Sequence, residues 1–300
     1  MPVTSSVPST RISVILARDS SRAVVLRRGP SKQVRLISWD RNGDSFEGGQ
    51  WFAGRIYSHR CDLSPKGEFF VYFAGAYKRE PRTWTAISRP PYFSALAMWP
   101  KGDAWGGGGL FATERHLQLN HGASDHVLAD GFELPRGFSV GLLGDHSGMG
   151  EDNPIAHARL VRDGWSLSRE GQHTKHSYQT AMSWEYTQTQ VYAKPSPTRP
   201  TLRLERHLHG VHERNGPWYA FSYEVHDEKA GDRHGFGRID WADWDTQGDL
   251  LYAVDGCIHR IRTRKHPLED AAREPALLID LRGDRFRNIP PPAHALQWKR

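Results

Sequence analysis

Short apolar runs separated by polar turns make up the first ordered part of the chain. β-Branched and aliphatic residues dominate Arg11–Ala17, Ala23–Arg27 and Gln33–Trp39, and the segments between them carry Ser, Gly, Pro and charged residues. Branched side chains pack well on a pleated surface, whereas Gly, Pro and Ser favour turns. The pattern therefore predicts a meander of three strands.

Turn signals recur along the rest of the chain, near residues 20, 66, 114, 164, 215 and 247. Asp163-Gly164 and Asn215-Gly216 are strong signals for two-residue hairpin turns. No stretch of about 12 residues combines helical periodicity with capping signals. The best helical candidate, Pro267–Arg273, is short, so the sequence predicts an all-β protein.

One turn sequence occurs twice. The segments CDLSPKGEFF and ADWDTQGDLL align without a gap, so that Asp62 matches Asp243 and Gly67 matches Gly248. An apolar run follows each glycine. This recurrence favours a repeated bend between two strands, and it argues against a unique active site at either aspartate.

The segment Asp62–Gly75 resembles the repeat of TolB-type β-propellers, and WD40 repeats more distantly, while Asp243–Val254 is a degenerate copy. In the TolB repeat a Ser-Pro-Asp-Gly-like turn precedes an apolar strand that ends in a small residue; Lys66 stands where that motif usually has Asp. The resemblance and the turn spacing imply a β-propeller of five to seven blades, with six favoured. Evenly spaced hairpins are also typical of a β-sandwich or a pair of barrels.

We expect a single domain over residues 11–300, preceded by a disordered tail over residues 1–10. A closed ring avoids a frayed edge when strands from the two termini pair with each other. The strand near Arg11–Ala17 is therefore expected to complete the blade that contains Ala276–Leu281.

The charge balance is basic, because 40 Lys and Arg residues stand against 34 Asp and Glu residues and give a net charge of +6. Arg260, Arg262 and Arg264 alternate, and in a strand their side chains would lie on one face. That face is a candidate nucleic-acid surface. No run of five like charges occurs, so solvated charges of mixed sign explain the balance as well.

The two cysteines, Cys61 and Cys257, are too few for a disulfide framework or a cysteine zinc site. Free structural thiols in a reducing compartment are the expectation. No apolar run approaches the roughly 18 residues of a transmembrane helix, and the first residues lack a signal-peptide pattern. The sequence predicts a cytoplasmic protein without a membrane partner.

Three histidines cluster in the segment HLHGVH. His207 and His209 share one face of a strand and His212 follows three residues later, so neutral imidazoles at these positions are candidate zinc or copper ligands. No cysteine or carboxylate completes a familiar spacing, and a chain with 16 His residues contains clusters by chance. We therefore expect no metal and no other cofactor.

A polar loop from Leu143 to His157 concentrates carboxylates and imidazoles. Asp145, His146, Asp152 and His157 are its candidate catalytic residues. Five-bladed glycosidase propellers use carboxylates across their central funnel for acid–base chemistry. Calcium binding and a simple solvated loop are the other interpretations.

The glycine-rich segment from Trp105 to Phe111 could cradle a phosphate with its backbone N–H groups. No Lys-Ser or Lys-Thr pair follows, so close packing or a lid explains the glycines better. Trp105 remains a candidate ligand-binding residue. A G-x-S-x-G nucleophile elbow is absent from the sequence.

The leading interpretation is a bacterial-type cytoplasmic propeller that binds or scaffolds without catalysis, with another protein or a small ligand at its face. The first alternative is a propeller hydrolase or lyase that acts on a carbohydrate-like substrate at the central funnel. The second is a nucleic-acid-binding protein that uses the arginine face. Three or more carboxylates or histidines that converge in one pocket would favour the enzyme.

Overall fold

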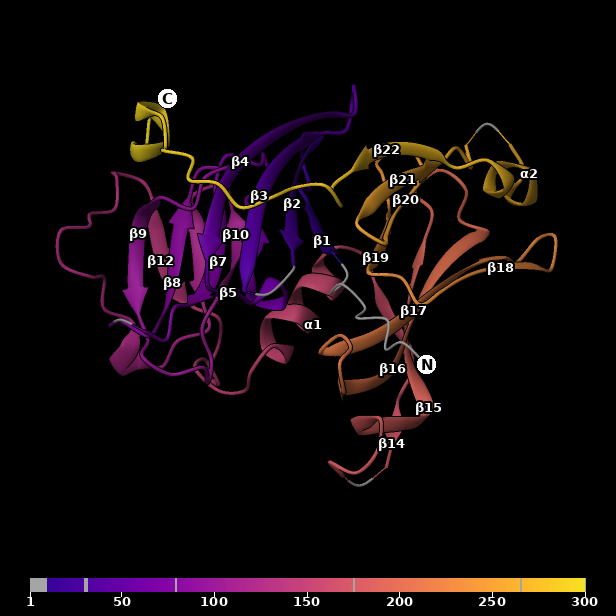
Figure 1. The fold of residues 1–300 in the computed structure, drawn as a ribbon, viewed down its shortest axis with the longest axis horizontal. Coiled ribbons are helices and arrows are strands. Elements are labelled where there is room, and N and C mark those ends of the chain that lie inside the picture. Colours follow the sequence, from indigo (N-terminus) through magenta and orange to yellow (C-terminus); the bar gives the residue numbers. More distant parts are fainter. Residues whose placement is uncertain (1–9, 30–31, 79, 175, 265, 300) are drawn as a thin grey trace, which may run out of the picture. The chain divides into compact units, whose positions relative to one another are not determined.

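The structure is a computed structural model that describes residues 10–29, 32–78, 80–174, 176–264 and 266–299 (Figure 1). Strands dominate these residues and form five sheets. The helices within the same ranges are short: α1 (Asn153–Arg162), α2 (Leu268–Arg273) and the 3₁₀ turns η1 (Ser58–Arg60), η2 (Ala123–Asp125) and η3 (Ala293–Leu296). The prediction of an all-β protein is confirmed.

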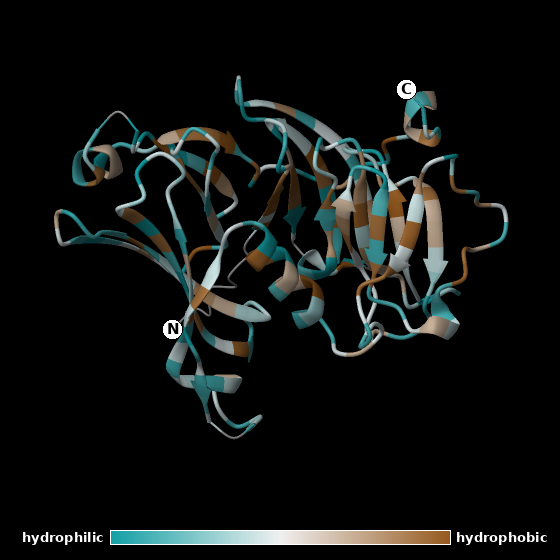
Figure 2. Cartoon of the chain, turned by 180° about the vertical axis from the view of Figure 1, so that it is seen from behind, coloured by the Kyte–Doolittle hydropathy of each residue, from teal (hydrophilic) through white to brown (hydrophobic). Residues whose placement is uncertain are grey.

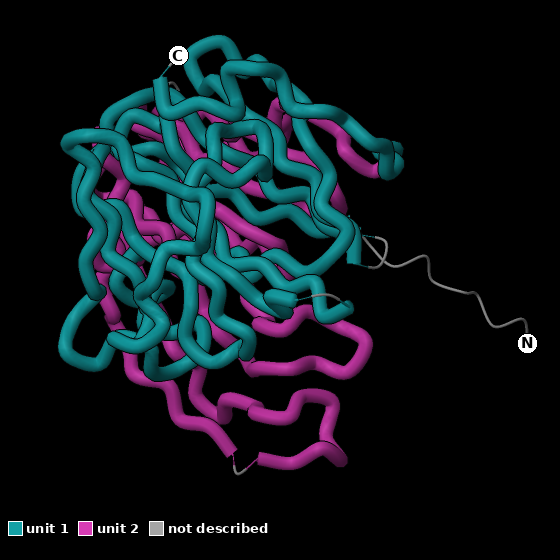
Figure 3. The backbone as a smooth tube through the Cα atoms, turned by 90° about the vertical axis from the view of Figure 1, so that its left-hand side faces the viewer, with its two compact units in different colours: residues 1–159, 283–300 teal, residues 160–282 magenta. Residues whose placement is uncertain are grey.

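The chain divides into two compact units (Figure 3). Unit 1 comprises residues 1–159 and 283–300, and unit 2 comprises residues 160–282. The single domain predicted over residues 11–300 is not tested by this division and stays a prediction. Of the tail predicted over residues 1–10, only Thr10 is among the described residues.

Unit 1 contains three sheets among its described residues. The first is an antiparallel meander in chain order, made of β1 (Arg11–Leu16), β2 (Arg22–Arg28), β3 (Gln33–Asp40) and β4 (Ser45–Ala53). The second has the order β5-β7-β8-β9, with β6 also on β7: β5 (Arg55–Ile56), β6 (Asp62–Leu63), β7 (Phe70–Gly75), β8 (Thr83–Ser88) and β9 (Ala95–Pro100). The third joins β10 (Gly109–Thr113), β11 (His116–Leu119) and β12 (Ser139–Leu142).

Strand β7 contributes to two core clusters of unit 1 and is buried along its whole length. Phe70 and Tyr72 pack in a core cluster with residues of β1, β2 and β3. Val71, on the opposite face, packs in a second cluster with residues of β9, β10 and β11. Successive strand residues point to opposite faces, so an unbroken apolar run is what a strand between two cores requires. The strands of this unit accordingly carry the hydrophobic bands in Figure 2.

The segment after residue 282 packs on unit 1. The Arg35 guanidinium lies 2.5 Å from the Asp284 carboxylate, and the Gln50 side-chain amide donates to the Ile289 carbonyl at 3.1 Å. The Trp298 ring contacts the Phe138 ring at a centroid distance of 5.0 Å. Unit 1 is therefore completed by the C-terminal segment.

Unit 2 contains two sheets among its described residues. In the larger, β13 (Ser166–Arg169) and β14 (Gln172–His173) both pair with β15 (Met182–Pro195), which is followed in order by β16 (Leu202–Glu213), β17 (Tyr219–Asp227) and β18 (Asp232–Gly237). The smaller is a meander in chain order of β19 (Trp241–Trp244), β20 (Leu250–Val254), β21 (Cys257–Ile261) and β22 (Ala276–Asp280).

The two sheets of unit 2 share one core. Leu204 of β16 and Val225 of β17 pack in a cluster with Trp244, Leu250 and Ile261 of the smaller sheet, and all five are buried. Side chains alternate along a strand, so the other face of β16 and β17 presents the residues between these apolar ones. That second face carries the polar groups described below.

The Asp163-Gly164 pair ends helix α1 and does not form the predicted hairpin turn. The Gly164 N–H bonds to the Val161 carbonyl, the Trp165 N–H bonds to the Leu160 carbonyl, and Gly164 has a φ of 89°. This pattern is a Schellman cap, which requires a left-handed residue after the helix. The hairpin predicted at Asp163-Gly164 is therefore wrong, because the same Asp-Gly pair can end a helix.

The two similar turn sequences form the same bend up to their glycines. The Gly67 N–H donates to the Ser64 carbonyl at 2.8 Å, and the Gly248 N–H donates to the Asp245 carbonyl at 3.1 Å. Both glycines have a positive φ, 74° and 88°. The side-chain oxygens of Ser64 and Asp245 also accept backbone N–H groups from within the turn. The recurring sequence therefore marks a bend.

The first of these turns is one residue longer. Leu63 pairs with Phe70 across six residues, whereas Trp244 pairs with Leu250 across five. Glu68 is the additional residue, since the glycines occupy equivalent positions. After the glycine, the gapless sequence alignment therefore differs by one residue from the alignment of the strand positions.

The predicted pairing of the first strand, near Arg11–Ala17, with the blade that contains Ala276–Leu281 is wrong. Among the described residues β1 pairs with β2 alone and β22 with β21 alone, so no strand pairing joins these two strands. Pairing β1 with β22 would add a contact at the other edge of each strand, and this contact would have to offset the conformational entropy of closing the long loop between them. Strands β11 and β12 moreover pair in parallel, unlike the antiparallel strands of a propeller blade. Within the described ranges, neither helix is long and apolar enough to cross a membrane.

Candidate functional site

The four candidate catalytic residues of the 143–157 loop do not converge. Asp145, His146 and His157 are exposed, whereas Asp152 is buried. The Asp152 carboxylate lies 2.5 Å from Nε of Arg60. Asp152 is therefore part of a buried ion pair rather than of an acid–base pair with its neighbours in sequence.

The glycine-rich segment is a packing element. The N–H groups of Gly106, Gly107 and Gly108 bond to the Gly150 carbonyl, the Asn120 carbonyl and the Thr85 hydroxyl. These donors are used within the chain, so they do not form a phosphate cradle. Trp105, which precedes them, is 55% exposed.

The three arginines of the predicted nucleic-acid face are separated by the fold. Arg260 is buried and forms ion pairs with Asp245 and with Asp249, the latter at 3.4 Å. Arg262 and Arg264 are exposed and follow the end of β21 at Ile261. The prediction of one arginine face is wrong, because the strand ends before the alternation does.

One cavity in unit 1 has a volume of about 270 Å³ and is lined by few groups that could act in catalysis. Its lining includes Trp39, Asp40, Glu47 and Arg22, and thus two carboxylates and no histidine. It does not meet the criterion of three converging carboxylates or histidines that would favour an enzyme.

The candidate metal-ligating histidines also diverge. His209 Nε2 is hydrogen-bonded to the Ser222 hydroxyl at 2.6 Å, and His212 Nδ1 is hydrogen-bonded to the Ser183 hydroxyl at 2.7 Å. Burial lowers the pKa of His209, which favours the neutral form of its ring. A bulge between Leu208 and Gly210 interrupts the strand at His209, and His212 has a φ of 58°.

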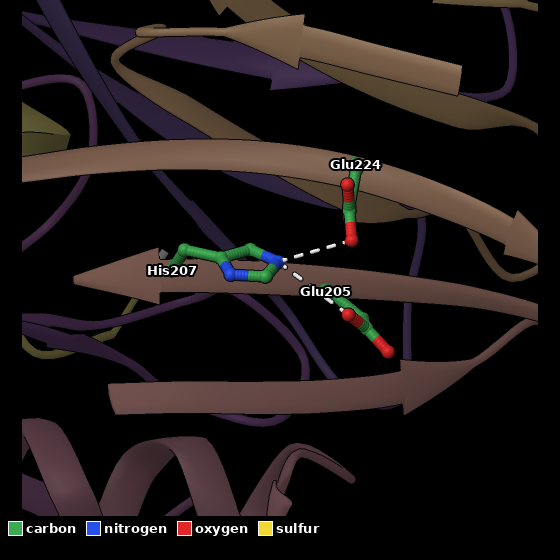
Figure 4. A group of neighbouring side chains, drawn as sticks. All are labelled: Glu205, His207 and Glu224. Carbon is green, nitrogen blue, oxygen red and sulfur yellow. Dashed lines mark ion pairs between the residues drawn. The ribbon is translucent and has the colours of Figure 1, made fainter. Parts of the chain in front are cut away.

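His207 instead faces two carboxylates (Figure 4). Its Nε2 atom lies 3.4 Å from Oε2 of Glu205 and 3.4 Å from Oε1 of Glu224. Glu205 and His207 lie two residues apart on β16, and Glu224 is the direct partner of Glu205 on β17. The backbone pairing therefore places all three on the face of the sheet that lies opposite the core of unit 2. One donor atom from each lies within 4.8 Å of the others, which makes the group a candidate metal centre.

The group is largely withdrawn from solvent. The side chains of Glu205, His207 and Glu224 are 10%, 16% and 25% exposed. His207 Nε2 is itself buried and has no hydrogen-bond partner among the described residues. A buried nitrogen without a hydrogen bond is costly, so this atom suits an additional ligand.

Two arginines neutralise part of the carboxylate charge. Arg203 lies 3.0 Å from Oε1 of Glu205 and 2.7 Å from Glu228, and Arg233 lies 3.1 Å from Oε1 of Glu224. Three carboxylates thus share two guanidinium groups. Oε2 of Glu205 remains directed at His207.

A cluster of rings lies at one end of the larger sheet of unit 2, and we call it the aromatic surface. Its members come from β14, the loop after it, β15, β16 and the loop before β17: His173, His176, Tyr178, Trp184, His212 and Trp218. Neighbouring rings form a continuous series, with centroid distances of 4.8 Å for Trp184–His176, 4.2 Å for His176–Tyr178, 6.4 Å for Tyr178–His212 and 4.8 Å for His212–Trp218.

The aromatic surface is open to solvent. Tyr178 is 71% exposed, Trp184 38% and Trp218 40%. Gathered exposed rings of this size mark binding surfaces more often than scattered single ones do. The Arg214 guanidinium beside the surface donates to the Tyr178 carbonyl at 2.8 Å, and Glu213 pairs with Arg238 at 2.9 Å. The charges of Glu213 and Arg238 are thus paired within the chain, whereas Arg214 keeps its charge.

Sequence reasoning found His207 but missed both glutamates. The alternation of Arg203, Glu205 and His207 was a usable signal, since it places all three on one strand face. Glu224 lies 17 positions after His207, and only the pairing of β16 with β17 brings it to the group.

Comparisons with known proteins add no family. No family model and no curated protein matches the chain. Among solved structures, an uncharacterized protein from Listeria monocytogenes EGD-e is similar at 9% sequence identity with a TM-score of 0.24. That match covers 91% of this chain and 54% of the other, so the chain spans about half the length of that protein.

Proposed function

We propose that the protein is a non-catalytic binding protein and that the aromatic surface binds a carbohydrate. The observation that carries this proposal is the continuous series of exposed rings on unit 2, which includes Tyr178, Trp184 and Trp218. The face of an aromatic ring is negatively polarised and attracts the polarised C–H bonds on the flat side of a sugar.

Charge distinguishes a sugar from a nucleic acid as the ligand. Nucleic acids need free cationic groups along the binding surface, because phosphate contacts supply most of the affinity. At the aromatic surface the charge of Arg238 is paired with Glu213, whereas Arg214 is exposed and keeps its charge when it donates to the Tyr178 carbonyl. The predicted face of Arg260, Arg262 and Arg264 is also not formed, since Arg260 is buried. The pairing of Arg238 and the burial of Arg260 favour a neutral ligand over a nucleic acid.

The proposal makes the protein a binder rather than a hydrolase. The candidate residues Asp145, His146 and His157 are exposed, and Asp152 is paired with Arg60. The first alternative, a hydrolase or lyase acting on a carbohydrate-like substrate, shares the ligand class but lacks this support.

Affinity electrophoresis tests the proposal. The full chain is run through native gels that contain soluble starch, hydroxyethylcellulose, xyloglucan or dextran, and retardation by at least one polysaccharide is expected. Trp184→Ala and Trp218→Ala should each weaken the retardation at least tenfold. Trp105→Ala is the matched control, because Trp105 is similarly exposed but lies in unit 1.

Three results would count against the proposal. If none of the polysaccharides retards the protein, a carbohydrate ligand is contradicted. If Trp105→Ala weakens the retardation as much as Trp184→Ala and Trp218→Ala do, the aromatic surface is not the binding site. Salt-sensitive binding of a single-stranded thymidine 20-mer, without polysaccharide binding, would favour the nucleic-acid alternative. Release of reducing ends from a retarding polysaccharide would favour the hydrolase.

A propeller of five to seven blades remains a proposal for the architecture. Its support is that the meanders β1–β4 and β19–β22 each have four strands in chain order, as a blade does. An experimental structure tests it, and sheets that do not surround a common axis would reject it.

A cytoplasmic location is likewise a proposal. It is supported by Cys61 and Cys257, which are both buried and unpaired. Fractionation of cells with an antibody to the chain tests it, and recovery outside the cytoplasmic fraction would reject it.

A further inference from the structure

We propose that Glu205, His207 and Glu224 bind a divalent transition-metal ion, for which Zn²⁺ is the best match. The three residues lie on β16 and β17, and none of them belongs to the aromatic surface. The proposal is therefore independent of the proposed carbohydrate ligand.

The distances fit a metal with short bonds. In a tetrahedral zinc site the bonds are about 2.0–2.1 Å, so neighbouring ligand atoms lie about 3.3 Å apart. His207 Nε2 lies 3.4 Å from an oxygen of Glu205 and 3.4 Å from an oxygen of Glu224. All three donor atoms lie within 4.8 Å of one another, and rotation of the Glu224 side chain would shorten the remaining separation.

A bound ion would relieve two unfavourable features of the group. Glu205 and Glu224 are directly opposite each other in the strand pairing, and like charges in such positions repel. His207 Nε2 is buried and has no hydrogen-bond partner among the described residues. A cation between the three groups reduces the repulsion and gives the imidazole nitrogen a partner.

The neighbouring arginines have different roles. Arg203 contacts Oε1 of Glu205, which orients Oε2 toward His207, as outer partners of metal ligands commonly do. Arg233 contacts Oε1 of Glu224, the same oxygen that faces His207. The Arg233 side chain is 59% exposed, so it can turn toward solvent when a metal takes its place.

The donor set selects the class of metal. One imidazole with two carboxylates suits Zn²⁺, Fe²⁺ or Mn²⁺ better than Mg²⁺ or Ca²⁺, which prefer oxygen ligands alone. Three protein ligands leave a fourth position for water.

Metal titration of the full chain, stripped with EDTA, tests the proposal. Competition with the chromogenic chelator 4-(2-pyridylazo)resorcinol should show one Zn²⁺ bound per chain, and Mg²⁺ and Ca²⁺ at the same concentration should not compete. His207→Ala and Glu224→Gln should each weaken Zn²⁺ binding at least tenfold. Co²⁺ should give the visible absorption of a four-coordinate site, and His207→Ala should abolish it.

The matched control is His209→Ala. This residue lies two positions from His207 and its Nε2 is hydrogen-bonded to Ser222, so its loss should leave the affinity within about twofold. Arg233→Gln should increase the Zn²⁺ affinity severalfold, because it removes a competing cation. Circular dichroism of each variant in EDTA establishes that it is folded.

The proposal is overturned if the wild-type chain binds no stoichiometric Zn²⁺, or if His209→Ala and His207→Ala lose affinity equally. Unchanged affinity in both His207→Ala and Glu224→Gln would also overturn it, since the ion would then lie elsewhere. Polysaccharide binding is measured in EDTA, so that failure of one proposal is distinguishable from failure of the other.

Discussion

Nε of Arg60 lies 2.5 Å from a carboxylate oxygen of Asp152, and the two side chains are only 2% and 10% exposed. Arg60 belongs to η1, and Asp152 directly precedes α1. The pair therefore links two distant parts of the chain within unit 1. It also gives Asp152, which sequence reasoning considered catalytic, a structural role.

Asp152→Ala is expected to destabilise the protein by about 3–5 kcal/mol, because it leaves the buried Arg60 charge without its partner. Urea unfolding followed by tryptophan fluorescence measures the change. Asp145→Ala is the control, since Asp145 is exposed and its loss should change the free energy of unfolding by less than about 0.5 kcal/mol. Equal effects of the two variants would contradict the structural role.

Arg260→Ala is expected to cost a similar amount, about 3–5 kcal/mol, because Asp245 and Asp249 would be left facing each other without a cation. Its control is Arg262→Ala, at an exposed position two residues further on. Thermal melting of both variants checks the prediction. If Arg262→Ala lowered the melting temperature as much, the buried ion pairs would not be the cause.

Gly107→Ala is expected to destabilise the protein more than Gly102→Ala does. Both glycines have a φ of 87°, so both variants incur the same left-handed strain of about 1 kcal/mol. A Cβ at Gly107 would lie 2.3 Å from the Phe73 ring, whereas at Gly102 no atom lies within 4 Å. The difference in urea midpoints between the two variants therefore isolates the steric effect, and equal midpoints would show that the segment relaxes.

The Cys61 thiol is expected to make the stability depend on alkaline pH. Burial raises its pKa to about 12 from an ordinary value of 9.0, so the folded state favours the neutral thiol. This contribution is fully present below pH 9 and is lost as the pH rises from 9 toward 12. The difference in unfolding free energy between wild type and Cys61→Ala should shrink over that interval, and a constant difference would contradict the assignment.

Local turn chemistry was the most predictable part of the fold. The recurring Ser64 and Asp245 turns form as bends because a left-handed glycine and a capping oxygen act within a few residues of each other. The structure at Gly164 could not be predicted from its turn sequence, because an Asp-Gly pair occurs in both hairpin turns and Schellman caps. Which sheets pair beyond each meander depends on contacts across the whole chain, and the predicted closure was wrong for that reason.

The candidate metal centre depends on how β16 and β17 are aligned, and the turn sequence between them predicts this alignment incorrectly. A two-residue turn at Asn215-Gly216 would place Glu205 opposite His226. In the structure the Glu213 N–H instead bonds to the Pro217 carbonyl, and the bulge near Leu208 shifts the pairing further, so Glu205 faces Glu224. The face that carries these residues follows from their alternation, but the partner of each one does not.

The division of unit 1 into residues 1–159 and 283–300 has a consequence during synthesis of the chain. Chains emerge from the ribosome with the N-terminal part first, and compact regions fold as they appear. Unit 2 is complete in sequence once Arg282 has emerged, while Arg35 and Phe138 still await Asp284 and Trp298. The unit that begins first is therefore completed last, and a chain truncated near residue 282 would contain all of unit 2 but an unfinished unit 1.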